Sequence, residues 1–180
     1  MRDFKSKDNL ILIGFASSGK TAVGKRLANV LKLSFMDLDR LVEAAFLNQC
    51  SESLICREIF KKYGEDRFRQ WESDALKDFA SQSGYVLATG GGTPMQEDNF
   101  RCLSELGIVI YLTASPQVIF HRFKDKGCPA YLEDNPTIEN LSLIYQQRDK
   151  IYKALAHYSI DTSNLTIEET VMEITEKVDL

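Results

Sequence analysis

The sequence contains few of the residues that build zinc sites and disulfide frameworks. Its 180 residues include only four cysteines and two histidines. No two cysteines stand in a C-x-x-C pair, so a structural zinc site is not expected. Without a secretory signal pattern, the expectation is a cytoplasmic protein with reduced thiols. The cysteines are Cys50, Cys56, Cys102 and Cys128.

The chain also lacks long apolar runs and an excess of positive charge. No apolar stretch approaches the ~18 residues of a membrane-spanning helix. The formal net charge is −4, which gives no support for binding to nucleic acid or to a membrane surface. Any anionic small molecule would therefore have to be bound by a few locally placed cations.

The patterns that are present indicate one α/β domain, because short apolar runs alternate with helical periodicity. The runs at 86–88 and 108–112 are continuously apolar, as in strands covered on both faces. Residues 125–136 fit neither pattern, and their Gly, Pro and charged residues predict a mobile loop. The expected strands are 9–14, 34–37, 85–89, 108–112 and 158–161, and helices are expected near 20–32, 39–47, 53–62, 66–82, 97–105, 116–124, 137–156 and 166–178.

The segment GFASSGKT at 14–21 directly follows the apolar run 10–13 and has the spacing G-x-x-x-x-G-K-T. In such a loop the glycines let the backbone N–H groups approach phosphate oxygens, and the following helix adds its dipole. Lys20 would reach the β- and γ-phosphates, and the Thr21 hydroxyl would bind Mg²⁺. A glycine-rich turn without a ligand is the alternative, but the flanking strand and helix favour phosphate binding.

Two carboxylates, Asp37 and Asp39, end the second expected strand. On extended backbone they would face the same side, so one could face Mg²⁺ and the other a substrate hydroxyl. A strand end followed by a helix N-cap at Asp39 is the alternative, and on these residues alone it is favoured.

Three consecutive glycines, Gly90, Gly91 and Gly92, follow the third expected strand. Because three glycines cost backbone entropy, they favour a ligand lying against the main chain at the carboxyl end of a parallel strand. Some arginines could also point into a cleft, although each alone is better explained as a surface residue of a helix. These are Arg67, Arg69, Arg122 and Arg148.

Five segments occur in an order that resembles the shikimate kinase family over nearly the whole chain. The resemblance implies a three-layer α/β P-loop kinase fold, whose five-stranded parallel sheet has the order 2-3-1-4-5. It also implies a single domain over 1–180, with an acceptor-binding region at about 38–65 and a lid at about 124–136. The segments are GFASSGKT at 14–21, FMDLD at 35–39, IF at 59–60 with FRQWE at 68–72, GGG at 90–92 and QRDKIY at 147–152.

The function implied by the resemblance is the ATP- and Mg²⁺-dependent phosphorylation of shikimate to shikimate 3-phosphate, in aromatic amino-acid (chorismate) biosynthesis. A monomer whose partner is this small-molecule substrate is expected. Carried over by position, Lys20, Asp39 and Arg148 are catalytic. Asp39 contacts shikimate hydroxyls, and Arg69 and Arg148 hold the carboxylate, which suits the fork of a guanidinium.

The remaining site residues follow from the same resemblance. Gly91 would donate its backbone N–H to a substrate hydroxyl, and Arg122 would lie against the adenine ring. The implied nucleotide-binding residues are Gly14, Ser17, Ser18, Gly19, Lys20, Thr21, Ala22 and Arg122. The implied substrate-binding residues are Asp39, Arg69, Gly90, Gly91, Gly92 and Arg148, and the implied Mg²⁺ ligands are Thr21 and Asp37.

The sequence departs from the family pattern in three places. Ser17 stands where the family usually has glycine, and Lys150 stands where it has proline. Cys128 stands where the family has a lid arginine that contacts phosphate and substrate. Lys124 or Lys126 could replace that arginine if the lid folds inward.

Three other functions remain open. The chain could be a kinase for another small acceptor, such as gluconate or a nucleoside monophosphate, which would explain Cys128. A nucleotide switch of the GTPase type would need an N-K-x-D or T-K-x-D segment, and none occurs. A catalytically weak paralogue kept for binding is favoured only by the altered lid.

Overall fold

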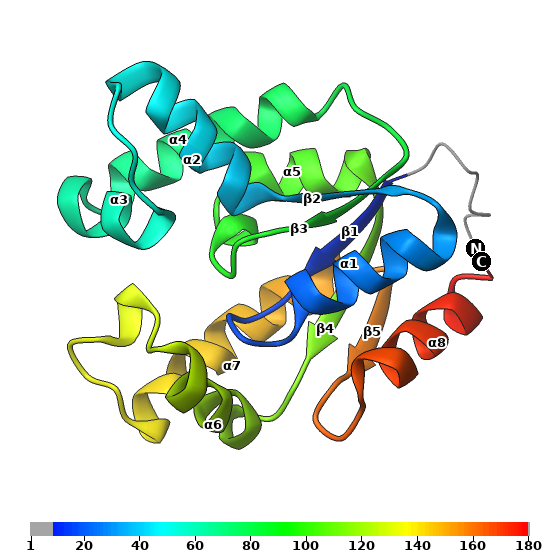
Figure 1. Cartoon of the computed structure of the whole chain (residues 1–180). Coiled ribbons are helices and arrows are strands. Elements are labelled where there is room, and N and C mark those ends of the chain that lie inside the picture. The colour runs from blue at the N-terminus through cyan, green and yellow to red at the C-terminus, as the bar shows by residue number, and fades with distance from the viewer. Residues whose placement is uncertain (1–8, 180) are drawn as a thin grey trace.

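A five-stranded sheet forms the centre of the computed structural model, which describes residues 9–179 apart from the side chains of residues 124–126 (Figure 1). Its order is β2-β3-β1-β4-β5, and every neighbouring pair is parallel. The order expected from the resemblance is therefore confirmed. The strands are β1 (Asn9–Ile13), β2 (Ser34–Asp37), β3 (Tyr85–Ala88), β4 (Gly107–Thr113) and β5 (Tyr158–Asp161).

Helices connect the strands nearly as the sequence predicts, with differences at their ends. The chain segment before the lid stays helical through Lys126, and a 3₁₀ turn interrupts the expected loop. None of the described helices is long and apolar enough to cross a membrane. The helices are α1 (Lys20–Leu31), α2 (Leu38–Cys50), α3 (Cys56–Tyr63), α4 (Glu65–Phe79), α5 (Glu97–Leu106), α6 (Pro116–Lys126), α7 (Ile138–Leu155) and α8 (Ile167–Lys177), with 3₁₀ turns η1 (Thr93–Met95) and η2 (Ala130–Leu132).

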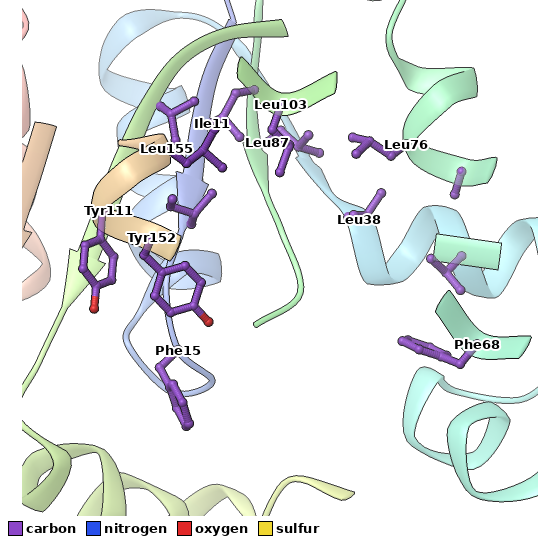
Figure 2. Packing of buried hydrophobic residues seen from close by; sticks show 14 of the residues in the cluster. Ile11, Phe15, Leu38, Phe68, Leu76, Leu87, Leu103, Tyr111, Tyr152 and Leu155 are labelled. Atoms are coloured by element: carbon purple, nitrogen blue, oxygen red, sulfur yellow. The ribbon is translucent and has the colours of Figure 1, made fainter. Parts of the chain in front are cut away.

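The alternation of side chains along β1 divides the core into two apolar clusters, one on each face of the sheet. Leu10 and Leu12 pack in a cluster with residues of α1 and α8. Ile11 belongs to the other cluster, where Leu103 of α5 and Leu155 of α7 lie near it (Figure 2). All five residues of β1 are buried, so the continuous apolar run reflects cover on both faces. The three-layer arrangement is thereby explained.

The carboxyl ends of the parallel strands meet at one edge of the sheet. The chain runs from β1 to β2 in one direction along the sheet, whereas it runs from the adjacent β4 to β5 in the other. Open α/β sheets bind ligands at this kind of switch point. The loop between α6 and α7, drawn in yellow, and α3, drawn in cyan, lie on either side of this edge (Figure 1).

A buried asparagine at the start of β1 joins the two connections that lead into the neighbouring strands. Asn9 is 2% exposed. Its Nδ2 donates to the carbonyl oxygens of Gln82, at 2.8 Å, and Leu106, at 3.2 Å. Its Oδ1 accepts from the backbone N–H of Tyr85 at 3.0 Å. One amide side chain thus fixes how β3 and β4 enter the sheet.

We predict that Asn9→Ala lowers the free energy of unfolding by about 2–3 kcal/mol, because it leaves backbone groups without partners. Urea denaturation followed by circular dichroism measures this change. Asn29→Ala is the matched control, since Asn29 is exposed on α1 and should change stability by no more than about 0.5 kcal/mol. Equal stabilities of the two variants would contradict the role given to Asn9.

Candidate active site

The loop between β1 and α1 has backbone conformations that favour glycine at two positions. Gly14 has a φ of 142°, and a Cβ there would lie 2.3 Å from the carbonyl oxygen of Leu112 in β4. Gly19 has a φ of 102°. Ser17 also has a positive φ, 61°, at the position where the family usually has glycine. The loop therefore has the left-handed residues of an anion-binding nest, and Ser17 adopts one of them at some cost.

Lys20 points back into this loop from the start of α1. Its Nζ donates to the carbonyl oxygens of Gly14, at 2.9 Å, and Phe15, at 2.8 Å. Burial lowers its pKa from 10.5 to about 8, although the carboxylates of Asp39 and Asp37 oppose that change. The ammonium group is thus held at the loop, where the oxygens of a bound phosphate would accept hydrogen bonds from it.

Two oxygen atoms beside the loop suit a magnesium ion. Thr21 Oγ1 donates to Asp37 Oδ2 at 2.8 Å, so hydroxyl and carboxylate face the same point. Hydroxyl and carboxylate oxygens are ligands that Mg²⁺ accepts, and the ion usually takes its remaining ligands from phosphate and water. No cluster of three or more His, Cys, Asp or Glu that could hold a metal occurs in the described part of the chain.

The structure corrects the placement of the two carboxylates. Asp37, not Asp39, is the N-cap of α2, and its Oδ1 accepts from the Asp39 N–H at 3.2 Å. Asp39 lies in the first turn of that helix rather than on extended backbone, because the helix begins at Leu38. The turn separates the two side chains, so that Asp37 faces Thr21 and Asp39 lies near Gly90.

Asp39 is the carboxylate at the centre of the site, and its side chain is open to solvent in the free protein. Desolvation by the surrounding protein raises its pKa from 3.8 to about 6, with further contributions from the carboxylates of Asp37 and Glu72 and an opposing one from Lys20. At neutral pH it is mostly ionised and can accept a proton. Together with Lys20, Thr21, Asp37 and residues of the loop, it lines a cavity of about 260 Å³.

The glycine triplet after β3 is explained by three close approaches to different groups. A Cβ on Gly90 would lie 2.7 Å from Glu72 Oε1, and one on Gly91 would lie 3.1 Å from the backbone nitrogen of Ala16. A Cβ on Gly92 would lie 2.1 Å from Arg69 Nη2. The triplet therefore fills the space between the phosphate loop and the charged residues of α4, where side chains do not fit.

A buried carboxylate positions Arg69. Glu72 is 1% exposed, and its Oε2 accepts from Arg69 Nη1 at 2.7 Å. Its Oε1 accepts from Thr93 Oγ1 at 2.7 Å. In the sequence, Glu72 stands out only as part of a motif, which does not predict this role. The i, i+3 spacing of Arg69 and Glu72 on a helix is the signal that points to it.

A second cavity of about 180 Å³ adjoins the first. Asp39, Gly90 and Gly91 line both cavities, so Asp39 lies where they meet. Arg69 and Gly92 also line the second one. Its other lining residues are not predicted as site residues from the sequence. They are Cys56, Arg57, Phe60, Phe68, Glu72, Pro129, Ala130 and Tyr131.

Arg148, on α7, lies near this cavity but is not among the residues that line it. Its guanidinium carbon is 4.3 Å from the ring centroid of Tyr131 and 5.4 Å from that of Phe15. Arg148 Nη1 and the Tyr131 hydroxyl are buried and have no hydrogen-bond partner within the described residues. The expected pair of Arg69 and Arg148 is thus gathered at one end of the site, with Tyr131 stacked on Arg148.

Arg122 lies at the opposite end of the phosphate loop. It donates to the carbonyl oxygens of Ser17, at 3.3 Å, and Thr162, at 2.7 Å. It lines a cavity of about 190 Å³ together with the loop and with Leu165, between β5 and α8. The structure therefore places Arg122 beside the phosphate loop, and its contact with an adenine ring stays a prediction. The side chains of Lys124 and Lys126 lie outside the described residues.

The fold and this site define a P-loop phosphotransferase, in which a glycine-rich loop, the paired Thr21 and Asp37 and the carboxylate of Asp39 surround two adjoining cavities. The family model "Shikimate kinase" matches residues 16–179. The chain belongs to the shikimate kinase family and is thus a kinase.

Similarity to known proteins extends over nearly the whole chain. A shikimate kinase of Geobacter sulfurreducens is 41% identical over 92% of this chain and 88% of its own length. A shikimate kinase of Thermoanaerobacter pseudethanolicus is 35% identical over 92% of this chain and 93% of its own length. The solved shikimate kinase of Acinetobacter baumannii in complex with shikimate has a TM-score of 0.85 and 32% identity, covering 97% of this chain and 94% of its own. These likenesses confirm the expected family and fold.

We predict that the carboxyl group of Asp39 titrates near pH 6 and that Asp37→Asn moves its pKa down toward 3.8, since the variant removes a neighbouring like charge. Carboxyl-carbon NMR measures both values. Glu43→Gln is the control and should produce a smaller change, because Glu43 contributes least to raising the pKa. A wild-type midpoint near 4, or a larger change in Glu43→Gln than in Asp37→Asn, would show that the carboxylates are not arranged as described.

Proposed function

We propose that the chain transfers the γ-phosphoryl group of ATP to the 3-hydroxyl of shikimate, with Mg²⁺, and that it works as a cytoplasmic monomer. The observation that carries this proposal is the position of Asp39 at the junction of the two cavities. We call the cavity of about 180 Å³ the acceptor cavity. A hydroxyl bound in it can approach both the carboxylate of Asp39 and the end of a nucleotide's phosphate chain. Membership of the shikimate kinase family supports shikimate as the acceptor.

The reaction is a single displacement at phosphorus. The shikimate hydroxyl oxygen forms a bond to the γ-phosphorus, and the bond from that phosphorus to the bridging oxygen breaks, with its electron pair going to ADP. The hydroxyl proton passes to the ionised carboxylate of Asp39. Catalysis then consists of positioning and of neutralising the charge on the transferred group.

The charges for this step come from residues around the phosphate loop. Lys20 is already directed into the loop by two carbonyl oxygens, so little reorganisation precedes its contact with phosphate. Thr21 and Asp37 would hold Mg²⁺, which shields phosphate charge when bound. Arg122 donates to the Ser17 carbonyl oxygen and so supports the curved conformation of the loop.

Recognition of the acceptor depends on its carboxylate. Arg69 is fixed by Glu72 and lines the acceptor cavity, and Arg148 has an unpartnered buried nitrogen nearby. Two guanidinium groups with free donors suit the carboxylate of shikimate. A shikimate held in this way would have its ring hydroxyls facing Asp39. A nucleoside monophosphate has no carboxylate for these arginines, and shikimate is preferred to gluconate because the chain belongs to the shikimate kinase family.

We predict that Arg69→Lys raises the KM for shikimate by about 10-fold or more while the Kd for ADP stays unchanged, because lysine keeps the charge but loses the planar fork. Coupled assays and calorimetry measure the two constants. A shikimate analogue without the carboxylate should bind wild type weakly and respond little to the substitution. If the analogue is phosphorylated as well as shikimate, the carboxylate is not what the site recognises.

A further inference from the structure

The lid at about 124–136 has Lys124 and Lys126 at its start, but its remaining segment, 127–136, contains no lysine or arginine and carries the carboxylates of Glu133 and Asp134. This segment thus brings negative charge toward a site where phosphoryl transfer already concentrates negative charge. Such a lid needs a cation from elsewhere in the chain, because uncompensated like charges oppose its closure.

Helix α3 provides cations directly opposite the lid. Arg57 and Lys61 are one helical turn apart and both pair with Glu133. Arg57 Nη2 pairs with Oε1, and Lys61 Nζ is 2.6 Å from Oε2. Arg57 and Lys61 pair with different oxygens of the Glu133 carboxylate, so two ion pairs attach the lid to α3.

Arg57 also reaches the lid at a second place, next to Cys128. A Cβ built on Gly127 would lie 3.4 Å from Arg57 Nη1. One guanidinium nitrogen of Arg57 thus pairs with Glu133, and another lies near Gly127, the residue before Cys128.

The same guanidinium lines the acceptor cavity, together with Asp39, Arg69 and Tyr131. The Arg57 side chain is 45% exposed, so it is neither buried in the core nor fully surrounded by solvent. A guanidinium has several N–H donors, and the Glu133 contact leaves others to face the cavity. Lys61 can keep Glu133 neutralised while Arg57 donates to a bound ligand.

We propose that Arg57, carried by α3 and held against the lid by Glu133, provides the positive charge on the acceptor side of the transferred phosphoryl group that residues 127–136 lack. This inference rests on the proposed kinase function. It assigns to α3 the contribution that the sequence alone assigns to Lys124 or Lys126, and it explains how Cys128 is tolerated.

We predict that Arg57→Ala lowers kcat with shikimate by about 100-fold, as expected for loss of one charged donor at the transition state, while the Kd for ADP changes less than about twofold. Lys62→Ala is the matched control, because Lys62 lies on the same helix but pairs with Glu52, and it should leave kcat unchanged. Thermal denaturation of each variant shows whether it is folded.

Two further variants separate charge from lid attachment. Glu133→Gln removes the lid carboxylate but keeps Arg57, and should lower kcat by less than about 10-fold. Cys128→Arg in the Arg57→Ala background returns a guanidinium to the lid beside the missing one, and should restore kcat to within about 10-fold of wild type.

The inference is overturned if Arg57→Ala has wild-type kcat, if its loss equals that of Glu133→Gln, or if Cys128→Arg does not restore activity in a folded protein. It is also overturned if Lys126→Ala produces the loss instead. Wild-type protein that does not phosphorylate shikimate at all would refute the proposed function, whereas an active wild type with a normal Arg57→Ala would refute only the role of Arg57.

Discussion

The site depends on the close packing of the phosphate loop between β4 and the glycine triplet after β3. Gly14 lies against the Leu112 carbonyl, and Gly91 lies against the Ala16 nitrogen. A side chain at either glycine would push the loop away from one neighbour. Since Lys20 and Asp39 are positioned from the two sides of this contact, both the phosphate site and its distance from the acceptor cavity depend on it.

This packing buries Lys20 and partly desolvates Asp39, and their shifted pKa values show the cost. Desolvation lowers the pKa of Lys20 and raises that of Asp39, so each charge is disfavoured in the free protein. The raised pKa of Asp39 means that folding stability decreases as the pH rises from about 4 to about 6, because the folded carboxyl keeps its proton longer than the unfolded one. Such groups are poised to interact strongly with phosphate, a metal ion and a hydroxyl.

Most of the fold could be predicted from the sequence, because strands buried on both faces produce continuous apolar runs, as in 108–112, and the G-x-x-x-x-G-K-T spacing fixes the first turn. The prediction that Asp39 caps α2 is wrong, because the carboxylate of Asp37, two residues earlier, accepts from the Asp39 N–H and is the N-cap. The roles of Glu72, Tyr131 and Arg57 were not predicted, since they arise from contacts between α4, α3 and the lid that local patterns do not encode. Arg148 was predicted as a site residue, but its stacking on Tyr131 depends on how the lid packs.

The most direct test of the account is to identify the product formed from ATP, Mg²⁺ and shikimate by ³¹P NMR and mass spectrometry while ADP is counted in the same reaction. The account predicts one shikimate 3-phosphate for each ADP and almost no ADP without the acceptor. ADP release that is independent of shikimate, or faster transfer to gluconate or a nucleoside monophosphate than to shikimate, would contradict it.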